Sequence, residues 1–462
     1  MAMMKGFSNA FRIPGLRKKI FITLGLVIVC RIVSQIPTPG INWDALMSLQ
    51  AALKGLMSSS DAGSNFFGWF ETFTGGGLSQ CAIGTLSIWP YISAQIVIQL
   101  LSSVIPSLEK LKKEGENGRQ QLAQITRYLT IVLCVVQAWG IATVLSHPGM
   151  LSPELSNRVL VPHPGLGFHL MTVIGMTTAS LFVMWLADQI TTFGVGNGAS
   201  LIIMINITSR LPDAIRSAYE RYFVAKVAPV SGLGILIVFF LLVVMGTVML
   251  TQGVRKIAIH STRRSVGGGN TFGMRQSFMP LRVNYTGVMP IIFAQPLIQI
   301  AAAVVKYFAA PTGRLHDIAM MLSETTWLHI TIYSVLIVFF TFFWVATQFN
   351  AIDISDNLKK DGSYIPGIRP GRATAEYLDD VMTKITLIGA TGLLVIALVP
   401  MLIMSWTKPP LAWSIASFFG GTSLLIIVGV ALDTLRIMES HLLVRKYDGF
   451  LSHGTLRGRG GV

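Results

Sequence analysis

Charged residues are scarce in this chain of 462 residues. Asp, Glu, Lys and Arg make up 12% of the sequence and hydrophobic residues 52%, whereas soluble domains carry about 25% charge. Apolar stretches near the length of a membrane span account for this composition. They cover residues 20–36, 83–104, 124–145, 169–188, 197–212, 231–251, 284–305, 328–349, 384–405 and 412–435. The sequence therefore predicts an all-α polytopic membrane protein with ten transmembrane helices.

Acidic side chains are almost absent from these spans. Eight of the ten contain no Asp or Glu, and Asp188 and Asp433 lie near span ends. An ion-coupled transporter normally needs a carboxylate or a histidine chain inside the membrane, and His169 and His329 lie at span edges without a partner base. The chain also has no P-loop and no HExxH helix. These absences disfavour a pump, a membrane protease and a P-loop ATPase, and we expect no enzymatic activity and no cofactor.

Cysteine is rare as well. Cys30, Cys81 and Cys134 lie in or beside apolar spans, and no two of them form a CxxC pair. Such a pattern is typical of buried cysteines that act as small hydrophobic side chains. We therefore expect neither a structural disulfide nor a metal site.

The positive charge that is present is unevenly distributed. Lys and Arg are concentrated at the two ends of the chain, in residues 1–19 and 436–462, and in the even-numbered connections, those that follow the second, fourth, sixth and eighth spans. The positive-inside rule then places both termini in the cytoplasm, where basic loops also meet anionic lipid headgroups. Arg31 is the one charge well inside a span, at a cost of about 2.5–3.5 kcal/mol. Either it extends outward to the interface or it faces a wet interior.

Two of the spans repeat one pattern. Segments 83–104 and 284–305 align without a gap, with prolines, alanines and glutamines at matching positions: Pro90 with Pro290, Ile92 with Ile292, Ala94 with Ala294, Gln95 with Gln295, Ile98 with Ile298 and Gln99 with Gln299. Glutamines at i and i+4 share one helical face, and their polar amides are unfavourable in contact with lipid. Paired, proline-interrupted helices indicate a passage at the interface of two halves. A passive channel or a secondary transporter with inverted repeats would fit, and the lack of intramembrane carboxylates favours the channel.

Two long connections predicted to be cytoplasmic carry basic residues. Loop 252–283 contains Arg255, Lys256, Arg263 and Arg264, and loop 350–383 contains the turn IPGIRPG at 365–371. Prolines fix two dihedral angles of that turn and glycines adopt conformations that other residues avoid, so the turn holds Arg369 at a rigid tip. The charge could serve only to orient the helices. The stiffness of the tip favours a docking contact.

Several long motifs resemble the SecY family, the central subunit of the bacterial protein-translocation channel. Similarity extends from about Gly15 to Asp433. The matching stretches are SIWPYISAQIVIQLL (87–101), KKEGENGRQQLAQITRY (112–128), MWLADQITTFGVGNG (184–198), NLKKDGSYIPGIRPG (357–371) and FGGTSLLIIV (419–428).

The resemblance implies two five-helix halves, 20–215 and 231–435, related by inverted pseudo-symmetry. Segments 83–104 and 284–305 would form a lateral gate to lipid, lined by Ser93, Gln95, Gln99, Gln295, Gln299 and Ile300. It also implies a short re-entrant plug helix at about 66–78, which contains Phe66 and Phe70 and whose Gly75, Gly76 and Gly77 offer a hinge.

The resemblance further implies a pore constriction. Its ring falls on Ile88, Ile92, Ala199, Ile203, Ile292 and Ile426. A collar of branched aliphatic side chains blocks ions by dewetting, yet parts around an unfolded chain. Three positions depart from the family pattern: Ser87 stands where glycine is usual, Ala199 replaces a bulkier residue, and Ala351 often has proline in its place.

These features predict a channel that passes unfolded preproteins across the bacterial cytoplasmic membrane and releases transmembrane helices into membrane lipid. Because the chain has no nucleotide site of its own, work must come from a SecA-type motor ATPase or from a translating ribosome. Signal sequences and nascent chains would be its clients. The resemblance also implies small membrane subunits like SecE and SecG.

Overall fold

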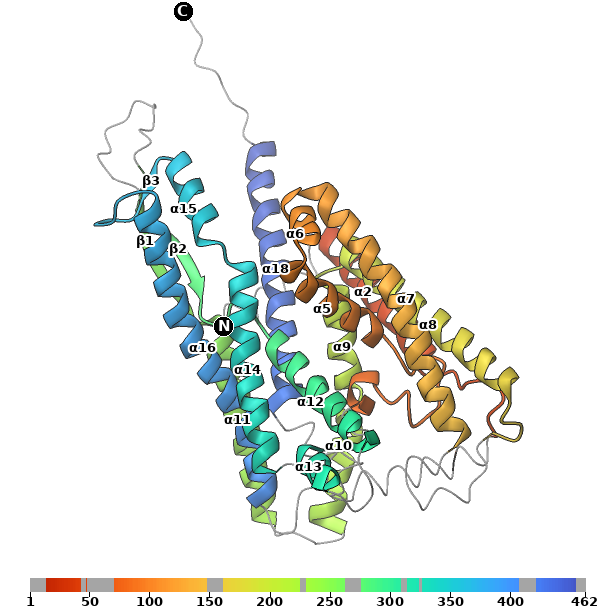
Figure 1. Ribbon diagram of the computed structural model, residues 1–462. Coiled ribbons are helices and arrows are strands. Elements are labelled where there is room, and N and C mark those ends of the chain that lie inside the picture. The colour runs from red at the N-terminus through yellow and green to blue at the C-terminus, as the bar shows by residue number, and fades with distance from the viewer. Residues whose placement is uncertain are drawn as a thin grey trace, which may run out of the picture. The chain divides into compact units, whose positions relative to one another are not determined.

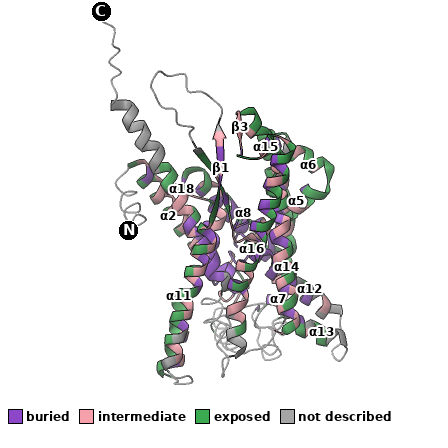
Figure 2. Ribbon diagram, turned by 90° about the vertical axis from the view of Figure 1, so that its left-hand side faces the viewer, coloured by how far each residue is buried: buried purple, intermediate pink, exposed green. Residues whose placement is uncertain are grey.

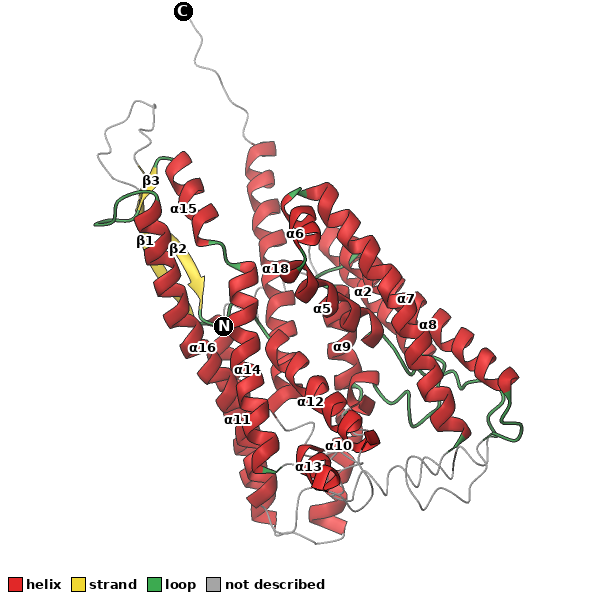
Figure 3. Ribbon diagram, in the orientation of Figure 1, coloured by secondary structure: helices red, strands yellow, loops and turns green. Residues whose placement is uncertain are grey.

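The computed structural model describes residues 14–42, 47, 70–147, 161–224, 230–261, 276–308, 314–323, 326–406 and 421–453. Helices dominate these residues, and the strands described among them form one three-stranded sheet (Figure 3). Five of the described helices are long and apolar enough to cross a membrane. A sixth span results if α5 (Trp89–Val104) and α6 (Pro106–Lys113), which are bent by 105° at their junction, count as one. The predicted all-α membrane fold is confirmed.

The chain divides into two compact units. The first holds the described residues before Ala214, and the second holds those from Ala214 to Gly429. The final helix, α18 (Gly421–His453), contributes to both, because its residues from Val430 onward belong to the first unit.

The first unit is organised around one long helix, α8 (Leu166–Phe193), which packs against α2, α7 and α9. The other helices of the unit are α2 (Pro14–Val33), α5, α6, α7 (Glu116–Ser146), α9 (Gly198–Thr208) and the start of α10 (Leu211–Tyr219) (Figure 1). A glycine allows α9 to approach α8 closely, because a Cβ atom on Gly198 would lie 2.0 Å from the carbonyl oxygen of Ala187. The absent side chain therefore brings α9 directly against α8.

The second unit packs α12 against α13 and α14, and α16 against α11, α14 and α15. Its elements are the π-helix η3 (Glu220–Val224), α11 (Val230–Gln252), β1 (Val254–Ser261), β2 (Gln276–Arg282), α12 (Met289–Phe308), α13 (Arg314–Ser323), α14 (Trp327–Gln348), α15 (Ala351–Lys360), β3 (Ser363–Tyr364) and α16 (Arg372–Trp406). Much of α11 has the colour of exposed residues in Figure 2, and Val238, Leu241 and Met249 are among the exposed apolar residues of this helix. Exposed apolar residues on a helix of this hydropathy are expected in contact with lipid.

Each of the ten predicted spans overlaps a helix, but the predicted boundaries were wrong in places. Residues 83–88 form turns, and α5 begins only at Trp89, with Pro90 in its first turn. Residues 412–420 lie outside the described part. The error has the opposite sign for α16, which begins at Arg372, before the predicted start of its span at 384. No Gly or Pro interrupts the chain between Arg372 and Ile388, so the helix continues beyond the apolar stretch.

The two connections predicted as loops contain regular structure. β1 and β2 pair antiparallel, with Val254 opposite Arg282 and His260 opposite Gln276, and β3 adds to the free edge of β1. Ile257 of β1 is buried in the same apolar cluster as Leu378 of α16. The loop prediction for 252–283 and 350–383 was therefore wrong in part, because this cluster stabilises a sheet that local sequence does not show.

Candidate functional site

Residues 70–88, the described part of the chain that leads into α5, pack into the first unit and are called the re-entrant segment below. Residues 70–74 form a short helical turn and residues 75–88 a series of tight turns. Phe73, Leu78, Cys81 and Ala82 are all buried. The predicted plug at about 66–78 falls partly on this segment. Phe66 lies outside the described residues, and Phe70 is half-buried at the first described position.

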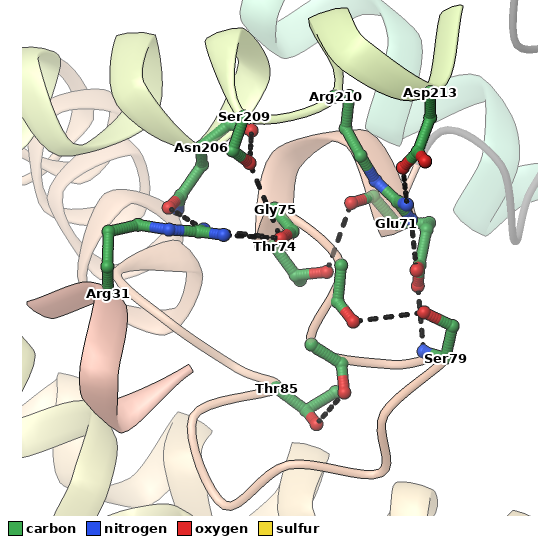
Figure 4. A network of polar contacts seen from close by, with 12 residues as sticks. Arg31, Glu71, Thr74, Gly75, Ser79, Thr85, Asn206, Ser209, Arg210 and Asp213 are labelled. Atoms are coloured by element: carbon green, nitrogen blue, oxygen red, sulfur yellow. Dashed lines mark hydrogen bonds and ion pairs between the residues drawn. The ribbon is translucent and has the colours of Figure 1, made fainter. Parts of the chain in front are cut away.

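A single amide joins this segment to α9. Asn206 of α9 is fully buried, and its Nδ2 donates to the Phe73 carbonyl oxygen and to Ser87 Oγ, each at 3.0 Å. Its Oδ1 accepts a hydrogen bond from Arg31 Nη1 at 3.4 Å. Asn206 therefore ties both ends of the re-entrant segment and the intramembrane arginine together. Figure 4 shows its contact with Arg31.

Arg31 points into the unit rather than outward. Its Nη1 and Nη2 both donate to the carbonyl oxygen of Gly75, each at 3.2 Å. Gly75 has φ +66°, and a Cβ atom there would lie 2.4 Å from Arg31 Nη1. Glycine is required at this position because it permits both the left-handed backbone and the close approach of the guanidinium.

An ion pair holds the first turn of the segment. The Glu71 carboxylate, with 3% of its side chain exposed, pairs with Arg210 Nη2. Its other oxygen accepts the backbone N–H of Ser79 at 3.1 Å, and Arg210 also contacts the exposed Asp213 at 3.1 Å. Sequence reasoning missed this network. The available signal was Glu71 itself, the one acidic residue in the predicted plug.

The predicted ring residues of the first unit lie close to this segment in sequence and along α9. Ile88 and Ile92 are buried, and the Ile88 carbonyl accepts from the Ile92 N–H at 3.2 Å, so the pair shares a face. On α9, Ile203 is buried and Ala199 half-buried. Positions 199, 203 and 206 follow helical spacing, so the ring candidates and Asn206 share one side of α9.

In the second unit the remaining ring candidates, Ile292 of α12 and Ile426 of α18, are also buried, with 4% and 1% exposed. The burial of these side chains is what a dry constriction needs. That all six form one ring stays a prediction.

The two repeated segments begin alike. α5 starts at Trp89 and α12 at Met289, each one residue before its aligned proline. Their glutamines differ, because Gln95 is exposed and Gln295 is buried, with its Oε1 unpaired among the described residues. Ser93 and Gln99 are half-buried, whereas the side chains of Gln299 and Ile300 are not described. The lateral gate stays a prediction.

The docking candidates lie on two elements of the second unit. Arg255 and Lys256 are exposed on β1, and Arg263 and Arg264 lie outside the described residues. Arg369 is exposed in the turn 365–371.

Side chains on both flanks fix that turn. Thr374 Oγ1 donates to the Arg369 carbonyl at 2.9 Å, and Ser355 Oγ donates to the Gly371 carbonyl at 2.7 Å. Ile365 anchors its start in the apolar cluster of β1, β2 and α16. The geometry is therefore that of an immobilised cationic tip.

All three cysteines are free and buried, which confirms their assignment as small hydrophobic residues. Cys81 lies between α2 and α5, outside the spanning helices. Burial, and to a smaller degree the negative charge of Glu71, raises the pKa of its thiol to about 12. The thiol is therefore protonated and unreactive at neutral pH. No group of three His, Cys, Asp or Glu residues that could hold a metal ion occurs among the residues the structure describes.

The whole fold is that of a known class of membrane channel. A solved structure described as "The structure of a protein conducting channel" superposes with a TM-score of 0.61 at 17% identity, covering 92% of this chain and 93% of the other. Sec61 in the canine ribosome-channel complex from the endoplasmic reticulum gives a TM-score of 0.59 at 16% identity, covering 92% and 93%. The described helices therefore adopt the fold of a protein-conducting channel.

Sequence comparison identifies the family. The SecY family model matches residues 82–435. The protein translocase subunit SecY of Streptomyces scabiei is 40% identical over 452 residues, 97% of this chain and 100% of the relative. That of Escherichia coli strain K12 is 38% identical, covering 96% of both chains.

The chain belongs to the SecY family and is a protein translocation channel. The secondary-transporter alternative that the sequence left open is thereby set aside. A multi-pass membrane location follows from the same family assignment and from the apolar helices.

Proposed function

We propose that this channel passes unfolded preproteins across the bacterial cytoplasmic membrane, with both termini in the cytoplasm, and releases transmembrane helices sideways into lipid. One pore serves both outcomes because a segment of about 20 apolar residues is more stable in lipid than in a wet passage. A lateral opening between α5 and α12 lets each segment partition. The matched starts of these two helices support their equivalence in the halves 20–215 and 231–435, and the proposal relates these halves by inverted pseudo-symmetry.

The observation that carries the proposal is the re-entrant segment. Asn206 joins Phe73 of this segment to Ser87, the neighbour of the ring candidate Ile88. In this proposal the re-entrant segment is a movable plug beside the dry constriction, and the two together seal the membrane at rest. When a client enters, both would part without making specific contacts.

The channel has no catalytic role in this proposal. A SecA-type motor ATPase or a ribosome supplies the work and docks on the cytoplasmic elements that carry Arg255, Lys256, Arg263, Arg264 and Arg369. The exposure of Arg369 on a fixed turn supports this contact. SecE-like and SecG-like subunits would complete the complex, and signal sequences would open it.

A reconstituted transport assay tests the proposal. The full chain, co-purified with its small membrane subunits, is placed in liposomes with a SecA-type ATPase and a preprotein. We expect ATP-dependent protection of the preprotein from added protease, and no protection in vesicles that lack the chain. Absence of protection with an intact complex would contradict the proposal, and saturable uptake of a small solute would favour a transporter.

A further inference from the structure

We propose that Arg31 and Arg210 form a two-point latch that holds the re-entrant segment in its resting place. The inference rests on the proposed plug role of that segment and adds the residues that restrain it. Both arginines belong to parts of the first unit that frame the segment: Arg31 to α2, and Arg210 to the turn between α9 and α10.

The first point of the latch is a hydrogen-bonded clamp on the backbone. Arg31 donates twice to the Gly75 carbonyl, each at 3.2 Å, and Asn206 Oδ1 holds the same guanidinium at 3.4 Å. Ser209 Oγ approaches the same carbonyl at 3.5 Å. Hydrogen bonds from a charged donor are stronger than neutral ones. A charge inside a membrane is costly, and the charge of Arg31 strengthens the hydrogen bonds that hold the Gly75 carbonyl of the segment.

The second point is the ion pair between Glu71 and Arg210. The carboxylate is nearly inaccessible to water, whereas Arg210 keeps 20% of its side chain exposed. An ion pair broken in a buried setting leaves an uncompensated charge, which is strongly unfavourable. The ion pair therefore opposes small displacements of the segment, and it breaks only when the segment moves far enough for water to reach the Glu71 carboxylate.

The contacts within the segment differ in kind from the latch. Ser79 Oγ donates to the Gly76 carbonyl at 3.0 Å, and Thr85 Oγ1 donates to the Gly77 carbonyl at 3.0 Å. These bonds shape the segment but do not tie it to α2 or α9. The segment can therefore move as a folded unit once the arginine contacts drawn in Figure 4 break, together with the neutral hydrogen bonds from Asn206 to Phe73 and Ser87 and from Thr38 to Cys81.

Ion leakage measures the latch directly. The channel complex is reconstituted in planar bilayers without client, and resting conductance is recorded for Arg31→Gln, Glu71→Gln and Arg210→Gln. We expect each to raise conductance by about tenfold. Arg216→Gln is the matched control, because Arg216 pairs with Glu220 at 2.9 Å on an exposed helix surface. Conductance of the three variants no higher than that of Arg216→Gln would overturn the inference.

A rescue variant separates the latch from misfolding. Arg210→Lys keeps the charge that pairs with Glu71, so we expect it to restore most of the seal that Arg210→Gln loses. If Arg210→Gln does not assemble, the nearly isosteric Glu71→Gln decides alone. Conductance of Arg210→Lys equal to that of Arg210→Gln would show that the ion pair is not the restraint.

Preprotein transport by the same complexes in liposomes separates failure of the proposed function from failure of the latch. If the parent complex seals but does not transport, the proposed function fails. If the parent transports and the latch variants leave its resting conductance unchanged, only the latch fails. Leaky variants that still transport support both.

Discussion

Asn206 Nδ2 donates to Ser87 Oγ at 3.0 Å, and Ser87 holds a φ of +47°. A non-glycine residue in this left-handed region pays about 1–2 kcal/mol. The resemblance to the SecY family places glycine at this position, which such a backbone favours. In this chain the side-chain hydrogen bond offsets part of the strain.

The two simplest substitutions at Ser87 should therefore differ. Ser87→Ala keeps the strained backbone and leaves an Asn206 N–H unpaired, so we expect a loss of about 1–3 kcal/mol. Ser87→Gly also removes the acceptor but relieves the strain, so we expect a smaller loss. Thermal unfolding of the detergent-solubilised complex measures both. Equal unfolding temperatures for the two variants would contradict this account.

Gly75 should tolerate no side chain. Gly75→Ala places a Cβ atom 2.4 Å from Arg31 Nη1 at a φ of +66°, so we expect the segment to be displaced and resting conductance to rise. Gly76→Ala is the control, since Gly76 lies in the same segment with φ +98° and its Cβ position has no neighbour nearer than 3.6 Å. Backbone strain alone would raise the conductance of both variants equally, and that result would exclude the close contact as the cause.

Cys81 should report the same displacement chemically. In a Cys30→Ala, Cys134→Ala background, Cys81 is the one remaining thiol and is 1% exposed. We expect slow alkylation by a maleimide at rest and at least about tenfold faster alkylation in Gly75→Ala, because exposure restores an ordinary thiol pKa. Fast alkylation of the resting parent channel would be inconsistent with a closed segment.

The predicted collar can be tested by wetting it. Replacing Ile292 and Ile426 with serine should raise resting conductance, because dewetting depends on an apolar lining. Ile388→Ser is the control, since Ile388 of α16 is 64% exposed. Unchanged conductance in the Ile292→Ser, Ile426→Ser variant would remove these residues from the ring.

Arg369→Glu should abolish motor-dependent export while the chain still folds and inserts, since Arg369 is exposed in a turn. An acidic tip would repel the acceptor that the guanidinium pairs with. Export of a secretory preprotein into inverted vesicles measures the effect. Arg372→Glu makes the same charge change three residues on, and an equal loss there would point to general loop charge rather than to the tip.

The hydropathy of the sequence determined the membrane class, and its motifs determined the family. Both are local properties: an apolar stretch of about 20 residues prefers lipid whatever surrounds it. The turn 365–371 was predictable for the same reason, because prolines and glycines restrict their own dihedral angles. The sheet of β1, β2 and β3 was not, since it depends on burial against α16.

The sequence left open whether Arg31 extends outward or faces inward, and only the tertiary structure decided. Its partners, Gly75 and Asn206, stand 44 and 175 residues away along the chain. Glu71 and Arg210 are likewise separated by 139 residues. Periodicity and composition show which side chains must be buried or paired. The packing of α2 and α9 around the re-entrant segment decides which partner each of these side chains meets. No local sequence pattern contains that information.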